Sequence, residues 1–274
     1  MRDIRLHVIA DDYGTCAAVD QGILRCRREG ILTGASIAVN GDTARPALVE
    51  AQATGLNLGV HINLVDGKPI SPADAISTLL DENGRFWGTS ARFFATYWRG
   101  KIDSAHIRRE AEAQITWLLQ RGIHPTHIDS HQHVHLWYSM LPLFLELAKK
   151  YDIKRIRMPS LPPEPANGNI GRWFKYSALC YLGAFGRMKI ARTSLSVTDW
   201  LWGLMVTGEL DRDYLLRLLH SLPAGTHELI CHPSVQSEDC GGELWCHHGG
   251  EETAALTDPE VKEVITQRGI VLER

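Results

Sequence analysis

The stretch HIDSHQHVH, residues 127–135, holds one aspartate and four histidines within nine residues. Histidine is the commonest side-chain metal ligand and a general acid or base near neutral pH, so this density indicates a metal centre, a proton relay or both. Alternate residues of a strand share a face, so we expect His127, Asp129 and His131 to point one way and Ile128 the other. A solvated, histidine-rich loop is the alternative interpretation.

Apolar residues at helical spacing flank this stretch on both sides. The upstream helix is expected to begin after Ser104 and to end at Gly122. The downstream helix is expected over residues 141–150. Residues 126–130 should therefore form a short strand that leads, at His131, into a loop.

Strand-like and helix-like segments alternate along most of the 274 residues, and no internal repeat or linker interrupts them. This alternation predicts a single α/β domain over residues 1–274, with about seven parallel strands arranged as a barrel. An open sheet is the alternative. The strands are expected at residues 4–10, 35–39, 56–61, 126–130, 154–158, 193–198 and 228–232.

Residues 63–103, after the third strand, depart from the alternation. They are rich in Gly, Pro, Asp and Trp and are only weakly periodic, which is typical of a loop that carries function. We expect this long insertion to form a lid or a rim of the site.

Composition excludes some classes of function. A formal net charge of -3 and a hydrophobic fraction of 44% are ordinary, and they give no strong electrostatic bias towards nucleic acid or an anionic membrane. A nucleic-acid partner is therefore not expected. The N-terminal apolar run is too short for a signal peptide, so the cytoplasm is the expected compartment. Six cysteines without Cys-x-x-Cys pairs are expected to be reduced thiols. A zinc knuckle of Cys240, Cys246, His247 and His248 is a weaker alternative, because its spacing is irregular.

Two segments, residues 173–185 and 200–206, are unusually apolar. They suggest contact with a lipid-linked substrate or a membrane surface, while packing of a barrel helix and its rim is the alternative. The first segment is too short to span a bilayer. The oligomeric state is left open, and a homodimer is compatible with the sequence.

Polar residues stand where four predicted strands end: Asp11, Asp12, His61, His131 and His232. In a parallel α/β protein these ends converge on one face, where active sites lie. Two imidazoles and one carboxylate, with positions left open, suit a catalytic divalent metal. Taken singly, Asp12 could instead cap the following helix, and His61 could be structural.

Six motifs follow one another along nearly the whole chain: ADDYG (10–14), TGASIAVNG (33–41), GVHINL (59–64), HPTHIDSHQHVH (124–135), RIRMP (155–159) and ELICHPS (228–234). In their order and spacing they resemble the YdjC-like carbohydrate deacetylases, which include chitooligosaccharide deacetylases and hopanoid-biosynthesis-associated members. The resemblance implies a deformed (β/α) barrel that removes an N-acetyl group from a sugar. Gln132 stands where some members have histidine, and the HHGGEET segment lacks an arginine expected near it.

The resemblance also implies roles for individual residues. Asp12, His61 and His131 would hold one divalent ion. Asp11 would be the general base and His232 the general acid. Zn²⁺ or Mg²⁺ is expected, with Mn²⁺ or Co²⁺ as alternatives, and the two imidazoles suit Mg²⁺ less well.

The chemistry agrees with this assignment. A metal polarises the acetamide carbonyl and lowers the pKa of a bound water, whose proton Asp11 could take. His232 could protonate the departing amine, and a barrel is expected to bring it across the site from Asp11.

Four further residues are expected to support the site. Arg157 should orient Asp11 or bind substrate, although a structural ion pair is as good an explanation. Asp129 should accept a hydrogen bond from a ligating imidazole. Asn63 and His133 are expected to contact the substrate or to support a ligand.

Two other functions remain open. One is a metal-dependent phosphoesterase. Phosphate sites usually need clustered Arg or Lys, however, and Lys154, Arg155 and Arg157 are the only candidates for such a site. The other is a non-catalytic sugar-binding protein in which some of the eight tryptophans form stacking platforms.

Overall fold

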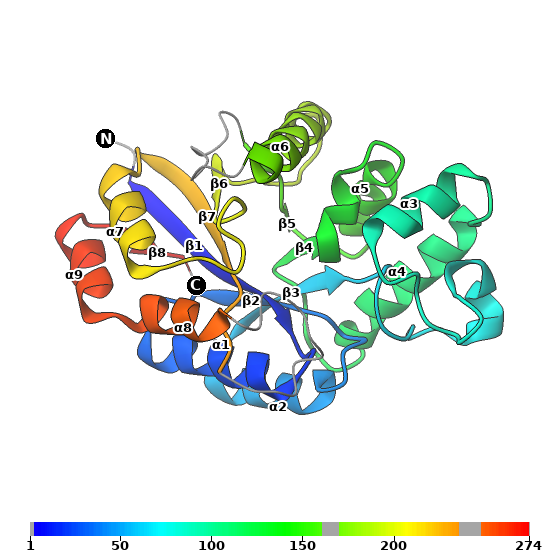
Figure 1. The fold of residues 1–274 in the computed structure, drawn as a ribbon, viewed down its shortest axis with the longest axis horizontal. Coiled ribbons are helices and arrows are strands. Elements are labelled where there is room, and N and C mark those ends of the chain that lie inside the picture. The colour runs from blue at the N-terminus through cyan, green and yellow to red at the C-terminus, as the bar shows by residue number, and fades with distance from the viewer. Residues whose placement is uncertain (1–2, 161–169, 236–247, 274) are drawn as a thin grey trace.

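A parallel sheet forms the centre of the computed structural model, which describes residues 3–160, 170–235 and 248–273 (Figure 1). Its strands run in the order β5-β4-β3-β2-β1-β7-β6, and β8 pairs with β1 outside this path. The strands are β1 (Ile4–Tyr13), β2 (Gly34–Ile37), β3 (Asn57–Ile62), β4 (His127–Ser130), β5 (Arg155–Ile156), β6 (Trp200–Trp202), β7 (Gly225–Cys231) and β8 (Val271–Leu272).

The central strands are apolar on both faces because helices cover the sheet. In β1, Leu6 and Val8 point to one face and Ile9 points to the other, and all three are buried. Burial of both faces is usual for a parallel sheet. The helices are α1 (Ala17–Glu29), α2 (Ala44–Thr54), α3 (Ser90–Trp98), α4 (Ser104–Leu119), α5 (Leu141–Lys150), α6 (Ile170–Ile190), α7 (Arg212–Ser221), α8 (Gly249–Thr257) and α9 (Pro259–Gln267), with the 3₁₀ helices η1 (Ala73–Leu79) and η2 (His131–Leu136).

The sheet is curled, and one segment connects its two edges. Ser196 pairs with Arg155 of β5, and its amide donates to the carbonyl of Lys154 at 2.8 Å. A few residues later, Trp200–Trp202 pairs with β7. This architecture confirms the deformed, barrel-like α/β fold expected from the sequence. The strand expected at 193–198 was misplaced, because only Ser196 pairs there and β6 itself begins at Trp200.

The insertion after β3 is attached to α4 by two buried polar side chains. The carboxylate of Glu110 accepts hydrogen bonds from the amides of Ile70 and Ser71, each at 2.9 Å. Gln114 accepts from the amide of Asn63 at 2.9 Å and donates to its carbonyl at 2.7 Å. The insertion therefore contains ordered structure, including η1 and α3, which its weak periodicity did not reveal.

Two further expectations concern single segments. Within the described residues, Cys16, Cys26, Cys180 and Cys231 are not joined in disulfides, in agreement with the reduced thiols expected. Cys240, Cys246 and His247 lie outside the described residues, and so does the zinc knuckle that would need them. Across the described ranges, no helix combines the length and apolar character needed to cross a membrane.

Candidate metal centre and active site

An irregularity at the end of β1 positions the two adjacent aspartates. The register with β2 shifts between Ala10 and Tyr13, and Asp12 adopts a left-handed conformation with φ of 64°. Aspartate tolerates this conformation better than most residues. Instead of pointing to opposite faces of a regular strand, Asp11 and Asp12 both line the same cavity. Asp12 does not cap α1, whose N-cap residue is Cys16.

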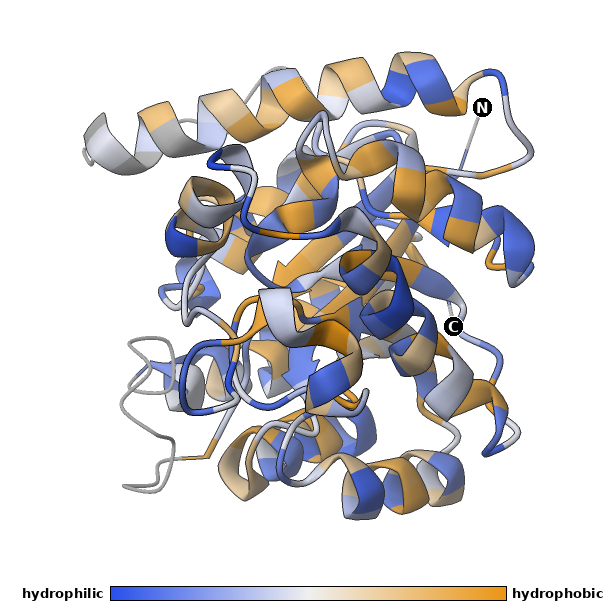
Figure 2. Cartoon of the chain, turned by 90° about the vertical axis from the view of Figure 1, so that its right-hand side faces the viewer, coloured by the Kyte–Doolittle hydropathy of each residue, from blue (hydrophilic) through white to orange (hydrophobic). Residues whose placement is uncertain are grey.

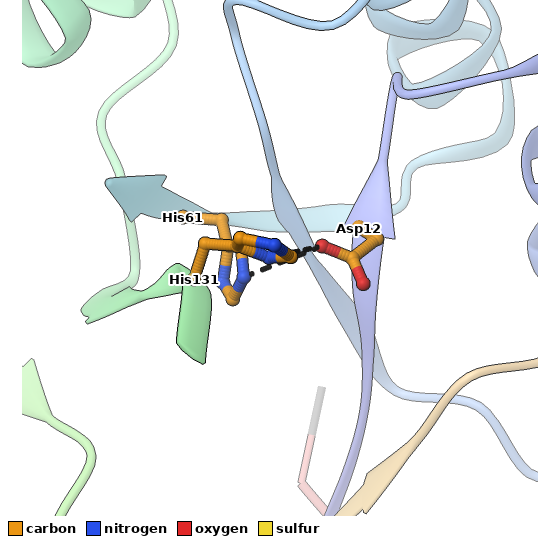
Figure 3. A group of neighbouring side chains, drawn as sticks. All are labelled: Asp12, His61 and His131. Atoms are coloured by element: carbon orange, nitrogen blue, oxygen red, sulfur yellow. Dashed lines mark hydrogen bonds and ion pairs between the residues drawn. The ribbon is translucent and has the colours of Figure 1, made fainter. Parts of the chain in front are cut away.

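Asp12, His61 and His131 converge from the ends of three strands (Figure 3). Oδ1 of Asp12 lies 3.0 Å from Nδ1 of His131 and 3.4 Å from Nε2 of His61. All three side chains are buried. The structure therefore brings together the three residues expected to ligate a metal.

These separations fit a single ion. Donor atoms about 2.1 Å from one metal lie about 3.0 Å apart at a right angle and about 3.4 Å apart at the tetrahedral angle. Asp11, His61 and Asp129 form an overlapping cluster of potential ligands. The carboxylates of Asp11 and Asp129 are, however, already occupied by other hydrogen bonds, whereas the carboxylate of Asp12 contacts the imidazoles of His61 and His131.

Asp129 orients His61. Its Oδ1 accepts from Nδ1 of His61 at 2.8 Å, which leaves Nε2 directed at Asp12. Burial alone would raise the pKa of Asp129, but Arg157 and His61 hold it well below its usual range. An ionised Asp129 bonded to His61 is the arrangement expected where a carboxylate supports a metal-binding imidazole.

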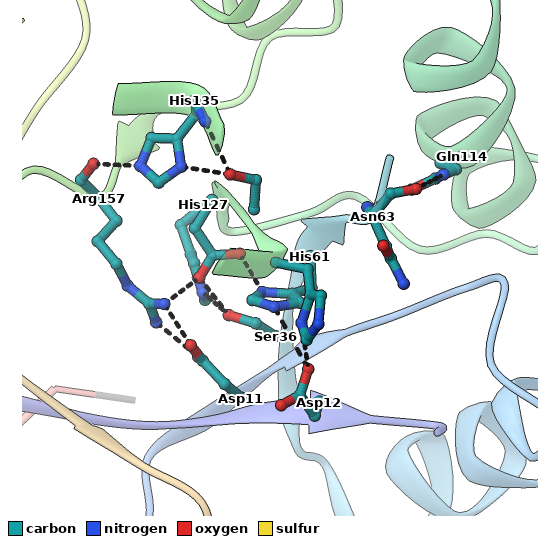
Figure 4. Close-up of polar contacts among 12 residues, drawn as sticks. Asp11, Asp12, Ser36, His61, Asn63, Gln114, His127, His135 and Arg157 are labelled. Carbon is teal, nitrogen blue, oxygen red and sulfur yellow. Dashed lines mark hydrogen bonds and ion pairs between the residues drawn. The ribbon is translucent and has the colours of Figure 1, made fainter. Parts of the chain in front are cut away.

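Behind Asp129 lies a second buried layer of hydrogen bonds (Figure 4). Ser36 donates to Oδ2 of Asp129 at 2.7 Å, and its oxygen lies 2.9 Å from Nε2 of His127. Arg155 lies 3.2 Å from Nδ1 of His127 and can only donate, so Nε2 carries the proton and donates to Ser36. Burial lowers the pKa of His127 well below its usual value, which keeps the ring neutral. His127 is therefore a support, and not a ligand.

Arg157 is the central cation of the site. Its guanidinium donates to both oxygens of Asp11, at 2.6 and 2.8 Å, and to Oδ2 of Asp129 at 2.7 Å. Its Nε donates to Glu228. The side chain is completely buried and does not line the cavity. Of the two roles expected for Arg157, orienting Asp11 is the one that the structure supports.

The electrostatics of the site favour a bound cation. Three buried carboxyl groups, those of Asp11, Asp129 and Glu228, contact the guanidinium of Arg157. A fourth, that of Asp12, lies against the imidazoles of His61 and His131. Burial would lower the pKa of His61, but the carboxylates of Asp129, Asp11 and Asp12 raise it to about 9. A divalent ion would offset the same excess of negative charge.

The cluster forms the polar floor of a cavity of about 550 Å³. The opposite wall is apolar and includes Trp137, Tyr176, Leu179, Leu182 and Leu204. Among the described residues that line the cavity, there is no lysine or arginine. The site therefore combines a polar reactive end with a surface suited to carbon-rich groups.

Two histidines of the cavity present free ring nitrogens. His133 and His232 both line it, and Nδ1 of each is buried without a hydrogen-bond partner in the described part of the chain. Glu252 holds the backbone amide of His232. The sequence led us to expect His232 across the site from Asp11. Instead, β7 pairs directly with β1, and Cys231 lies opposite Ala10. The two residues thus follow neighbouring strands.

Asn63 bonds the backbone of the insertion. Its Oδ1 accepts from the amides of Val65 and Asp66, at 3.1 and 3.0 Å, and the residue does not line the cavity. Asn63 shapes the start of the insertion. Similarly, His135 bonds Ser130 and the carbonyl of Arg157 and supports the turn after β4.

Sequence reasoning overlooked several residues that the structure brings to the site. Glu228 belongs to the ELICHPS motif, so its acidic side chain within an apolar strand was the available signal. Ser36 gave no such signal, because a serine in a strand is unremarkable. Trp137 lines the cavity only through the turn of η2, where Gln132 and His133 have positive φ values of 50° and 55°.

The curled parallel sheet and the acidic, histidine-containing cluster at its carboxyl edge define a barrel-like α/β protein with a candidate divalent-metal site. The chain belongs to the YdjC-like protein family, whose model matches residues 5–267.

Similar proteins cover nearly the whole chain. A Mus musculus protein named carbohydrate deacetylase is 31% identical over 98% of this chain and 93% of its own length. One of the same name from Thermoanaerobacter pseudethanolicus is 30% identical, over 97% and 96%. A solved structure from Enterococcus faecalis V583, described as a "putative cellobiose-phosphate cleavage protein", superposes with a TM-score of 0.78 at 27% identity and covers 99% of this chain and 97% of that one.

Proposed function

We propose that this protein is a metal-dependent carbohydrate N-deacetylase, which hydrolyses the N-acetyl group of an amino sugar or glycoconjugate. The observation that carries the proposal is the convergence of Asp12, His61 and His131 beside Asp11 on the floor of one cavity. The names of the full-length relatives support the same reaction class. The cytoplasmic location expected from the sequence stays a prediction.

Asp12, His61 and His131 would hold the ion. When bound, it would polarise the acetamide carbonyl and acidify a water molecule. Two imidazoles and one carboxylate favour Zn²⁺, Mn²⁺ or Co²⁺ over Mg²⁺, which prefers oxygen ligands alone.

Asp11 would accept the proton of the attacking water. Arg157 holds both of its oxygens from the side away from the cavity, which sets the orientation of the carboxylate. The arginine is itself fixed by Asp129 and Glu228, so the base is rigid. Preorganisation of this kind reduces the entropic cost of reaching the transition state.

His232 would deliver a proton to the nitrogen of the leaving amine. An amine leaves poorly as an anion, so a positioned acid lowers the barrier to breaking the C–N bond. The unpaired Nδ1 of His232 and its place in the cavity wall support this role. His133, which also has an unpaired nitrogen, is a candidate substrate contact.

The cavity supports a sugar better than a phosphate ester. Trp137 offers an aromatic surface on which the apolar face of a sugar ring could stack. Leu179, Leu182 and Leu204 suit an apolar portion of a glycoconjugate, such as a lipid. A phosphoesterase would need cationic groups in the cavity wall, and Arg157 is enclosed behind Asp11.

The insertion over residues 63–103 is proposed to act as a rim that influences substrate choice. Its Phe94 packs against Trp137 with ring centroids 4.3 Å apart, and Oε1 of Gln132 accepts from the amide of Ser90 at 2.7 Å. Shortening the insertion within residues 77–97 should change substrate preference more than metal affinity. An unchanged substrate profile would assign it a structural role only.

The test of the proposed function is release of acetate from a panel of N-acetylated sugars after reconstitution with each candidate metal. Activity should require metal and should be lost in His61→Ala and His131→Ala, which are expected to remain folded. A protein that binds these sugars tightly but releases no acetate with any metal would instead be a sugar-binding protein. Release of phosphate from sugar phosphates would favour the phosphoesterase.

A further inference from the structure

The long helix α6 has large apolar side chains on the face turned away from the sheet. Phe174, Tyr181 and Met188 are 64%, 70% and 65% exposed. They are seven residues apart, about two helical turns, so they form one row, and Trp173 lies next to it. A helix of a globular protein normally shows the opposite pattern, with its apolar stripe toward the core.

This row extends onto a neighbouring loop. Tyr138 is 71% exposed, and its ring lies 5.4 Å from that of Phe185. We define the α6 patch as Trp173, Phe174, Tyr181, Phe185, Met188 and Tyr138. The described residues include eight exposed large hydrophobic side chains, and five of them belong to this patch, so their exposure is concentrated at one place.

The inner face of α6 is attached to the barrel. Arg187 donates to the carbonyls of Met158, Pro159 and Thr198 at 2.7 to 2.9 Å. Gly183 packs so closely on Pro159 that a side chain would collide with it. The orientation of the helix is therefore fixed, and the outward position of the patch is not a consequence of loose packing.

The stretch of chain that contains α6 carries charge of one sign. From residue 165 to residue 198 the sequence contains basic residues but no aspartate or glutamate. Lys189 and Arg192, at the C-terminal end of α6, are exposed. In Figure 2, α6 is the long helix along the top, coloured orange and white over much of its length. Trp, Tyr and Phe beside basic residues are the composition of a helix that lies in a membrane interface.

We propose that the α6 patch docks this protein on the surface of an anionic lipid bilayer. The helix would lie in the plane of the interface, with its aromatic side chains among the headgroups and Lys189 and Arg192 near anionic phosphates. A second copy of the chain fits the patch less well, because two copies of the same basic surface would repel each other.

Docking would place the substrate cavity next to the bilayer. Tyr176, Leu179 and Leu182, on the inner face of the same helix, line the cavity. The proposal itself rests on the outer face and does not depend on the proposed deacetylase activity.

The test is co-sedimentation of the full-length chain with vesicles of phosphatidylcholine, with and without phosphatidylglycerol. Wild type should pellet with the anionic vesicles, and added salt should weaken its binding. The combined Phe174→Ser and Tyr181→Ser variant should bind at least about tenfold more weakly, because it loses apolar area that would be buried in the interface. Lys189→Gln with Arg192→Gln should reduce the preference for phosphatidylglycerol.

Val49→Ser is the matched control, because Val49 is 63% exposed on α2, outside the patch. It should bind vesicles like wild type. All variants should keep the thermal unfolding midpoint of wild type and its hydrolysis of short, soluble acetylated sugars, which separates docking from catalysis. Wild type that stays in solution with both vesicle types, or a combined Phe174→Ser and Tyr181→Ser variant that pellets like wild type, would overturn the proposal. A dimer in sedimentation velocity that Phe174→Ser with Tyr181→Ser converts to monomers would also overturn it.

Discussion

Nδ1 of His61 lies 2.8 Å from Oδ1 of Asp129, and this contact decides which nitrogen of His61 faces Asp12. Asp129 in turn depends on Ser36 and Arg157 for its position. The geometry of the candidate metal site thus depends on Asp129, Ser36 and Arg157, which lie behind the expected ligands.

Asp129→Asn should weaken metal binding. An amide cannot accept as strongly from Nδ1 of His61, and loss of such a supporting carboxylate typically costs about 10- to 100-fold in metal affinity. Competition with a chromogenic chelator would measure the change. Ser36→Ala, which removes only one hydrogen bond to Asp129, should have a smaller effect. Unchanged affinity in Asp129→Asn would show that this carboxylate does not hold His61 in place.

Asp11→Asn should retain metal and lose turnover, by roughly 10²- to 10⁴-fold for removal of a general base. Glu228→Gln is the matched control, because Glu228 also binds Arg157 but does not line the cavity. It should keep most of the kcat. If both variants lost the same activity, the position of Arg157 would matter more than proton transfer to Asp11.

His232→Ala should bind metal normally and hydrolyse an acetamide poorly, by about 10²- to 10⁴-fold. An activated aryl acetate, whose leaving group needs no proton, should be affected much less. His133→Ala provides the comparison, because His133 also lines the cavity with an unpaired nitrogen. Equal losses on amide and ester in His232→Ala, together with a lower unfolding temperature, would indicate a structural histidine.

Gly59→Ala should disturb the layer behind the metal site. A Cβ atom at residue 59 would collide with the ring of His127, which contacts Ser36. Overpacking of this kind typically costs about 1–3 kcal/mol in the free energy of unfolding, which urea denaturation would measure. In a His127→Ala background, where the ring is absent, the same change should cost less. An equal cost in both backgrounds would exclude the collision as its cause.

Asp20→Asn should stabilise the protein only at higher pH. Burial raises the pKa of Asp20 from 3.8 to about 6, so the folded state binds more protons than the unfolded state between these values. The unfolding free energy of wild type should therefore lose a contribution of up to about 3 kcal/mol as pH rises from about 4 to 6. Asparagine avoids this loss and keeps an oxygen for the amide of Gly14. A stability difference that is independent of pH would contradict the shift.

Most of the fold could be predicted because its signals are local. The alternation of apolar strands and amphipathic helices marks β1, β3, β4 and β7, each with its polar residue at the carboxyl end. Prediction failed for β6 and for α3. The position of β6 depends on its pairing with β7 more than on its own sequence. Helix α3 lies within the insertion, which is held in place by contacts with the distant residues Glu110 and Gln114.

By itself, the sequence determined the family, the succession of most strands along the chain and the residue types at their ends, because these follow from short-range pattern and motif spacing. Only the tertiary structure decided which groups meet. Arg157 reaches Asp11 across 146 residues of sequence, His232 lies beside β1 because β7 pairs with it, and Oδ1 of Asn63 accepts from the backbone of the insertion. Hydrogen bonds and ion pairs depend on distances of a few ångströms between groups brought together by packing, and spacing along the chain does not encode those distances.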